Sequence, residues 1–326
     1  PRLADAFQPV PAERAESPPE RFGGTAFSDA AITTGRGGHE LPRTPPRLMG
    51  IVNVTPDSFS DGGLHASPEA AIEHGRRLHA EGADLLDVGG ESTRPGATTV
   101  DPDEELERIL PVIEALSDLP IPISVDTRKS SVAAGAVRAG ATWINDVSGG
   151  TFDPEMLRTA AALDVPDVAM HCQGAPEVMQ ADPRYGDPVT EVREALRLRG
   201  RACLEAGIRL ENLVLDPGIG FGKRLEHNLA LLRRLEELRA LGCPLLLGVS
   251  RKSFIGHLTG AEEQRDWLAE GRHDRPQDRI GGTVAAGLAC VQRGADVIRV
   301  HDVRIMREAL LVARALQAPE TGPGVD

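Results

Sequence analysis

The chain contains 326 residues, which is enough for one large or two medium domains. Hydrophobic residues make up 40% of it but aromatic residues only 3%, so the core must be built mainly from Ala, Val, Leu and Ile. The formal net charge of -13 argues against nucleic acid or an anionic membrane surface as a partner, because neither attracts an acidic protein.

Local patterns argue against two further classes of protein. No long uncharged apolar run is present, so we expect no membrane-spanning helix. No basic-then-apolar signal segment opens the chain. The cysteines lie far apart and form no C-x-x-C pair: Cys172, Cys203, Cys243 and Cys290. We therefore expect free thiols in a cytoplasmic protein, with a disulfide or zinc framework as the alternative.

The first 46 residues differ from the rest of the chain. They hold eight of the 25 prolines, mixed charges and no sustained hydrophobic period. We expect a disordered Pro-rich extension over residues 1–46, with a short docking segment as the alternative. Residues 319–326 form a loop-like C-terminal tail, which leaves 47–318 as one domain.

This domain repeats a unit of helix, glycine and strand. Helical patterns begin at an N-cap followed by proline, at Ser67, Asp101, Asp153 and Asp187. They end at a glycine that leads into an apolar run, at Gly82, Gly140, Gly207, Gly242 and Gly294. The apolar runs predict eight strands: Leu48–Val54, Leu85–Val88, Ile121–Val125, Trp143–Asn145, Val168–Met170, Leu213–Leu215, Leu245–Val249 and Val297–Val300.

Short apolar strands that alternate with helices are typical of a parallel sheet covered on both faces. Eight such units predict an α/β fold, a closed (β/α)8 TIM barrel, and an open doubly wound sheet is the alternative. Most of the strands end in a polar residue: Asn53, Asp87, Asp126, Asn145, His171, Asp216, Ser250 and His301. In a barrel these ends meet at one rim, where the active sites of this fold lie.

Basic residues near the last two strands predict an anionic substrate. Arg299 and His301 are two residues apart on a strand, so they point the same way. Arg251, Lys252 and Ser253 directly follow the preceding strand. Together these residues would form a cationic pocket on an acidic protein. The alternatives are a pair between Arg299 and a carboxylate that braces the barrel, and solvated charges after the seventh strand.

The glycine-rich segment "LDPGIGFGKR" does not fit a nucleotide-binding loop. A P-loop needs four residues between its glycines and then Lys-Ser or Lys-Thr. Here three residues separate Gly218 from Gly222, and Arg224 follows Lys223. We expect instead that the glycines let the backbone approach a flat ligand, with Asp216 directed into the rim.

Seven segments in chain order resemble the dihydropteroate synthase family, and they extend from Leu48 to Val303. They are "MGIVNVTPDSFSDGG", "LLDVGGESTRPGA", "ISVDTRKS", "INDVSGG", "LDPGIGFGK", "GVSRKSFIG" and "IRVHDV". One departure is Cys172 in "MHCQG", where the family usually has Met.

The resemblance implies an enzyme of folate biosynthesis that condenses 6-hydroxymethyl-7,8-dihydropterin diphosphate with 4-aminobenzoate. The products are 7,8-dihydropteroate and diphosphate, and the family suggests a homodimer. The alternatives are a pterin-dependent methyltransferase barrel and an inactive pterin-binding scaffold.

The resemblance also implies the site residues. Those expected to bind the pterin diphosphate are Thr93, Asp126, Asn145, Asp216, Phe221, Lys252, Arg299 and His301. Those expected to bind 4-aminobenzoate are Phe59, Thr93, Arg94, Pro95, Lys252 and Ser253. Catalytic roles fall on Asp61, Asp126, Lys252, Arg299 and His301. Asn53 would hold Mg²⁺ through its side-chain oxygen, beneath a lid formed by Asp57, Phe59 and Asp61.

Overall fold

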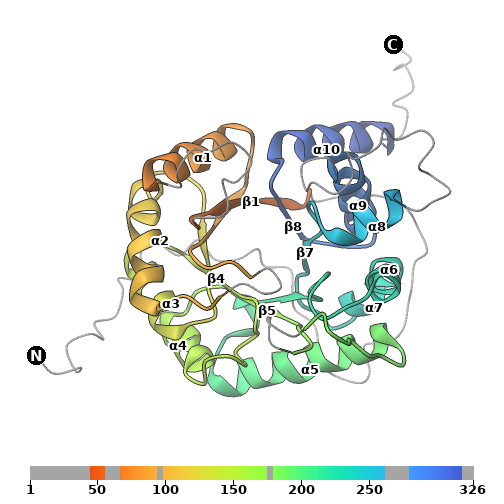
Figure 1. Cartoon of the computed structure of the whole chain (residues 1–326), viewed down its shortest axis with the longest axis horizontal. Coiled ribbons are helices and arrows are strands. Elements are labelled where there is room, and N and C mark those ends of the chain that lie inside the picture. The colour runs from red at the N-terminus through yellow and green to blue at the C-terminus, as the bar shows by residue number, and fades with distance from the viewer. Residues whose placement is uncertain (1–44, 56–66, 94–97, 175–178, 261–278, 318–326) are drawn as a thin grey trace, which may run out of the picture.

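The computed structural model describes residues 45–55, 67–93, 98–174, 179–260 and 279–317 (Figure 1). Nearly all of the predicted extension over 1–46 and the whole of the predicted tail over 319–326 lie outside these residues. Both therefore stay predictions.

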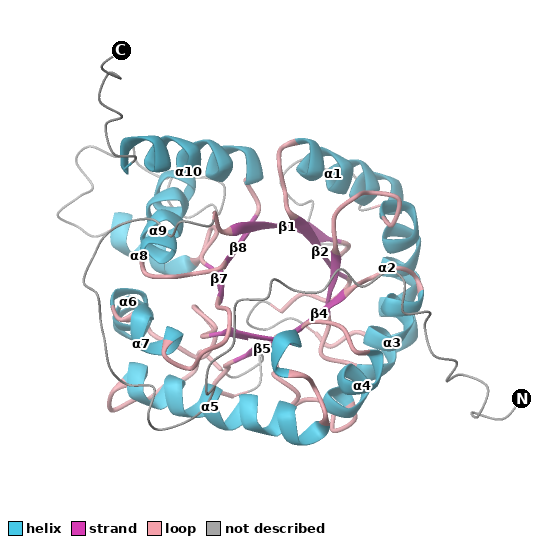
Figure 2. Cartoon of the chain, turned by 180° about the vertical axis from the view of Figure 1, so that it is seen from behind, coloured by secondary structure: helices cyan, strands magenta, loops and turns pink. Residues whose placement is uncertain are grey.

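Eight parallel strands form one sheet that closes almost completely into a barrel (Figures 1 and 2). They are β1 (Arg47–Asn53), β2 (Leu85–Gly89), β3 (Ile123–Asp126), β4 (Trp143–Asp146), β5 (Asp167–Met170), β6 (Leu213–Asp216), β7 (Leu246–Gly248) and β8 (Val297–Val300). Their order is β6-β5-β4-β3-β2-β1-β8-β7. A single parallel bridge between Leu215 and Leu245 joins the two outer strands. The predicted barrel and its eight strands are confirmed.

Helices surround the barrel (Figure 2). In the described residues they are α1 (Pro68–Ala80), α2 (Pro102–Leu116), α3 (Ser130–Arg138), α4 (Met156–Leu163), α5 (Pro188–Ala206), α6 (Leu225–Arg233), α7 (Leu235–Arg239), α8 (Ser253–Thr259), α9 (Ile280–Gln292) and α10 (Val303–Gln317), with a 3₁₀ turn, η4, at Leu210–Asn212. No helix among the described residues is long and apolar enough to cross a membrane. All four cysteines are free, as predicted.

Most helix boundaries follow the predicted signals. Ser67, Asp101 and Asp187 each accept a backbone N–H at the start of α1, α2 and α5. The prediction for Asp153 was wrong, because α4 begins only at Met156. Asp153 accepts the backbone N–H groups of Ser130 and Glu155 instead, at 2.8 and 2.9 Å. The five predicted helix-ending glycines all have positive φ, which glycine adopts without strain: Gly82, Gly140, Gly207, Gly242 and Gly294.

The interior of the barrel has an apolar and a polar half. Apolar side chains near the strand starts pack against one another and against Trp143: Met49, Leu85, Val168, Val214, Leu246 and Val297. Farther along the strands, the buried residues include Asp87, Asp126, Asn145 and Asp216. The rest of the core lies between the sheet and the helices. The apolar layer therefore closes the barrel beneath a polar rim.

Leu246 tests the contribution of this apolar layer to stability. Its side chain is completely buried, so Leu246→Ala should lower the free energy of unfolding by about 2–5 kcal/mol through lost burial and the cavity left behind. Leu198→Ala is the control, because Leu198 is 52% exposed on α5. Urea unfolding followed by circular dichroism measures both variants. Equal losses in the two would contradict the layered core described above.

Candidate active site

An ion pair across the barrel interior organises the polar rim. Arg299 on β8 donates from Nε to Asp87 Oδ2 on β2 at 2.6 Å, and from Nη2 to Asp126 Oδ2 on β3 at 2.7 Å. Asn145 on β4 donates to the same Asp87 oxygen at 3.0 Å. The alternative prediction for Arg299, a pair with a carboxylate that braces the barrel, is therefore confirmed. Its predicted contact with a ligand stays a prediction.

The two carboxylates each keep one oxygen unused. Asp87 Oδ1 and Asp126 Oδ1 are buried and have no hydrogen-bond partner within the described residues. Burial raises the pKa of Asp126 to about 7, with Arg299 opposing the rise and Asp87 adding to it. Buried acceptors are rarely left unpaired, and those that are often belong to functional sites. The pair thus offers acceptors that a ligand could use.

Two further titratable residues, Asp216 and Lys252, follow β6 and β7 and influence each other's pKa. Asp216 is 6% exposed and accepts the backbone N–H of Gly218 at 2.7 Å. Burial raises its pKa, while Lys252 lowers it. Burial lowers the pKa of Lys252 to about 8, and the charge of Asp216 opposes this. The Lys252 Nζ also lies 4.1 Å from the centre of the Phe221 ring.

The predicted cationic pocket is smaller than the sequence suggested. Arg251 is bound by Asp302, with its Nη2 2.7 Å from Oδ1 and its Nε 3.0 Å from Oδ2. His301 contacts Ser250 twice, through Nδ1 to Oγ at 3.0 Å and through its backbone N–H to Oγ at 3.2 Å. Arg299 is likewise paired, with Asp87 and Asp126, and the Lys252 ammonium lies over the Phe221 ring.

Lys223, for which the sequence predicts no role, is only 3% exposed. Its Nζ donates to the carbonyl oxygens of Gly218 and Phe221, each at 2.9 Å, and lies 3.0 Å from His171 Nδ1. Burial lowers the pKa of Lys223 to about 7. Lys223 therefore fixes the loop between Asp216 and Phe221.

Two glycines of this loop are needed for packing within the chain, whether or not a flat ligand binds there as predicted. A Cβ on Gly218 would lie 2.0 Å from the carbonyl oxygen of His171, and one on Gly222 would lie 2.4 Å from that of Gln173. Both glycines also have positive φ. Their close approach is to the loop after β5, so chain packing explains them without a ligand.

The remaining predicted residues fall into two groups. Asn53 is half-buried at the end of β1, opposite Gly89 in register, and Thr93 is half-buried after β2. Ser253 is exposed at the start of α8. The other predicted residues lie outside the described part of the chain: Asp57, Phe59, Asp61, Arg94 and Pro95.

Three of the polar strand ends have no role predicted from the sequence. They are Asp87, which binds Arg299 and Asn145, Ser250, which contacts His301, and His171, which contacts Lys223. Their position at a strand end places them at the rim. That position alone does not predict which side chain each residue contacts.

Comparison with known proteins identifies the family of this chain. The sequence profile of the pterin binding enzyme family matches residues 49–301. The dihydropteroate synthase of Synechocystis sp. is 46% identical over 270 residues, which cover 82% of this chain and 89% of the relative. That of Escherichia coli K12 is 43% identical over 279 residues, 85% of this chain and 94% of the relative.

Solved structures give the same result. Dihydropteroate synthase from Xanthomonas albilineans with 4-aminobenzoic acid has a TM-score of 0.75 and 50% identity, covering 84% of this chain and 94% of that one. The same enzyme in complex with 7,8-dihydropteroate has a TM-score of 0.72 and 47% identity over the same shares. The chain therefore belongs to the pterin binding enzymes and, within them, to the dihydropteroate synthase family.

Proposed function

We propose that the rim of this barrel condenses 6-hydroxymethyl-7,8-dihydropterin diphosphate with 4-aminobenzoate, giving 7,8-dihydropteroate and diphosphate. Family membership supports this reaction, which makes the chain a transferase of folate biosynthesis. The observation that carries it is the set of buried acceptors at the ends of β3, β4 and β6 and half-buried cations at the ends of β7 and β8, above an apolar layer. This set suits a flat polar ring with an anionic leaving group.

The pterin ring would bind along Asp216 and Asn145. The pyrimidine edge of a pterin presents adjacent N–H donors, which a carboxylate accepts in pairs, and the Asn145 amide can both donate and accept. Lys252 would donate to a ring acceptor, and the planar guanidinium of Arg299 would stack on the ring. Phe221 sits against Lys252 and limits where that side chain can move.

The reaction needs a cation-stabilising group and a place for diphosphate. The C–O bond to diphosphate breaks, the arylamine nitrogen forms the new C–N bond, and the amine loses one proton. An arylamine is already unprotonated near neutral pH, so no strong general base is required. Asp126 would stabilise the positive charge on the pterin methylene as diphosphate leaves, and Arg299 and His301 would bind the departing anion.

Magnesium is the proposed cofactor. When bound, it would neutralise charge on the leaving diphosphate. Among the described residues, no three His, Cys, Asp or Glu side chains gather to hold a metal ion. Asn53, at the end of β1, would hold the ion through its side-chain oxygen, since Mg²⁺ takes oxygen ligands and commonly keeps several waters.

The second substrate would bind beside the first. Thr93 after β2, with Lys252 and Ser253 after β7, would contact 4-aminobenzoate and its carboxylate. The family resemblance assigns Phe59, Arg94 and Pro95 to the same substrate.

We further propose a homodimer in the cytoplasm. The outer side of α10 exposes large apolar side chains that a second copy could cover: Ile305, Leu311, Val312 and Leu316. Free cysteines are the usual state in a reducing compartment.

A diphosphate-release assay tests the proposed reaction. The purified chain should release diphosphate from the pterin diphosphate only when both 4-aminobenzoate and Mg²⁺ are present. A folded chain that binds pterin without releasing diphosphate would point to the inactive scaffold. Methyl transfer from a methylpterin would point to the methyltransferase.

Asp216→Asn tests the pterin anchor. The amide replaces a charged acceptor, and a hydrogen bond to a charged group contributes about 1.5–3 kcal/mol. Calorimetry should therefore show pterin affinity reduced by one to two orders of magnitude in a variant that stays folded. Asp164→Asn, on the exposed C-cap of α4, is the matched control. Unchanged pterin binding in Asp216→Asn would reduce Asp216 to a loop-forming residue.

Asn53→Ala tests the proposed magnesium ligand. Mg²⁺ with diphosphate should tighten 4-aminobenzoate binding by about 5–150-fold if the two sites are coupled. The variant should lose most of this coupling but keep its affinity for pterin, because Asp216 and Asn145 are untouched. Titration of 4-aminobenzoate with and without Mg²⁺-diphosphate measures both proteins. Identical coupling in the variant would show that Asn53 holds no metal.

A further inference from the structure

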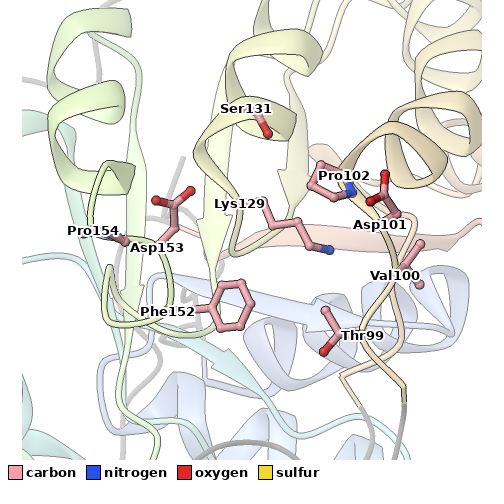
Figure 3. Close-up of a pocket in the computed structure, with 9 residues that line it drawn as sticks. All are labelled: Thr99, Val100, Asp101, Pro102, Lys129, Ser131, Phe152, Asp153 and Pro154. Carbon is pink, nitrogen blue, oxygen red and sulfur yellow. The ribbon is translucent and has the colours of Figure 1, made fainter.

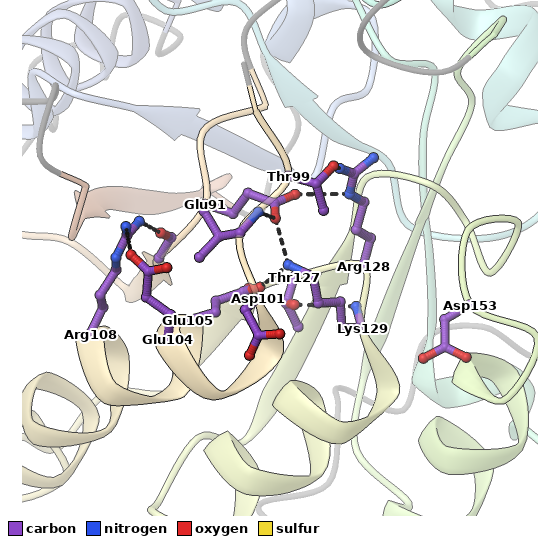
Figure 4. Close-up of polar contacts among 12 residues, drawn as sticks. Glu91, Thr99, Asp101, Glu104, Glu105, Arg108, Thr127, Arg128, Lys129 and Asp153 are labelled. Carbon is purple, nitrogen blue, oxygen red and sulfur yellow. Dashed lines mark hydrogen bonds and ion pairs between the residues drawn. The ribbon is translucent and has the colours of Figure 1, made fainter.

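A buried cluster of four charged residues lies beside the rim (Figure 4). The Glu91 cluster consists of Glu91, Glu105, Arg128 and Lys129, each no more than 8% exposed. Arg128 Nε donates to Glu91 Oε1 at 2.9 Å, and Lys129 Nζ contacts both Glu91 Oε2 and Glu105 Oε2. Two carboxylates thus balance two cations in a place where an unpaired charge would be costly.

The cluster joins three segments of the chain. Glu91 follows β2, Glu105 lies in α2, and Arg128 and Lys129 follow β3. These two basic residues come just after Asp126, the proposed cation-stabilising group. Glu91 comes just before Thr93, a proposed contact of 4-aminobenzoate. The cluster therefore connects the neighbourhoods of both substrates.

Glu91 and Arg128 also contact Val100 and Thr99, just before α2. Glu91 Oε2 accepts the backbone N–H of Val100 at 2.8 Å, and Arg128 Nη2 donates to Thr99 Oγ1 at 2.9 Å. Burial would raise the pKa of Glu91, but the hydrogen bonds from Lys129 and Val100 lower it below its ordinary value. The carboxylate is therefore ionised at neutral pH and keeps these contacts.

A cavity of about 570 Å³ lies on the other side of Lys129 (Figure 3). Phe152 lines it, with the Arg128 guanidinium 4.0 Å from the ring centre. The carboxylates at its edge, Asp101 and Asp153, already accept backbone N–H groups. We assign the cavity no ligand. The cluster lies in α2 and in the segments after β2 and β3, so we infer that its residues act on the reaction through others.

We propose that Glu91 is a positioning residue for the second substrate. Through Arg128 and Lys129 it holds Thr93 in position relative to Asp126, so that Thr93 can contact 4-aminobenzoate. This inference rests on the proposed function. A hydrogen bond to a charged group such as the 4-aminobenzoate carboxylate changes affinity by about 10–100-fold, which gives such a residue a measurable effect on the KM.

Steady-state kinetics of Glu91→Gln tests the inference. The amide keeps the shape but loses the charge that holds Arg128 and Lys129. The KM for 4-aminobenzoate should rise about 10–100-fold, while kcat and the KM for the pterin diphosphate change less than about twofold. A role in folding alone would lower the yield of active enzyme without separating the two KM values. Glu155→Gln is the control, since Glu155 forms an exposed pair with Arg158.

Thr99→Val provides a second test in case Glu91→Gln does not fold. It removes one uncharged acceptor and leaves all four charges of the cluster in place. The KM for 4-aminobenzoate should rise in this variant too, by a smaller factor. Where both single variants fold, the double variant should resemble Glu91→Gln, because both changes weaken contacts at Thr99 and Val100.

The outcomes separate the inference from the function on which it rests. A wild-type chain that releases no diphosphate would overturn the proposed function. An active wild type with an unchanged 4-aminobenzoate KM in Glu91→Gln would overturn the inference alone. If Glu91→Gln does not fold, an unchanged KM in Thr99→Val decides against it.

Discussion

The pairing of Arg299 with Asp87 and Asp126 is the interaction on which the rest of the rim depends. It ties β8 to β2 and β3 across the barrel interior, and Asp87 also receives the Asn145 amide from β4. A guanidinium in a barrel interior is costly unless it is paired and hydrogen-bonded, and here it is both. Four strands are thereby held in one arrangement by a few side chains. The apolar layer beneath them limits how far water can enter from below.

This arrangement prepares the site for charge that appears during the reaction. Acidic and basic side chains are buried together here. Burial favours the neutral form of each: it raises the pKa of Asp126 to about 7 and lowers that of Lys252 to about 8. Fixed charges in a dry site stabilise developing charge with little reorganisation. The free protein therefore already holds much of the geometry that the proposed condensation needs.

Much of the fold could be predicted because its signals are local. Each helix-ending glycine and each apolar run can be identified within a few residues, and the repeated unit determines the barrel. The partners of charged side chains could not be predicted in this way. Arg299 and Asp87 are 212 positions apart, and the sequence did not show that Arg251 would pair with Asp302. The contact of Asp153 with the backbone N–H of Ser130 was not predictable either, because it too joins residues far apart in the sequence.

The candidate site was predictable to a similar extent. Polar strand ends located the rim, and the family motifs named Asp126, Asn145, Asp216 and Lys252. Neither approach found the loop-fixing role of Lys223 or the Glu91 cluster. Both depend on side-chain contacts between segments that neighbouring strands bring together. Those contacts follow from how the strands are aligned in the barrel rather than from any local pattern.

A crystal structure of the chain with a pterin and diphosphate tests the central claim most directly. Our account predicts the pterin N–H edge within hydrogen-bond distance of Asp216 and Asn145, with Arg299 against the ring and still bound to Asp87. A pterin bound away from Asp216, or an Arg299 that has left both carboxylates, would contradict it.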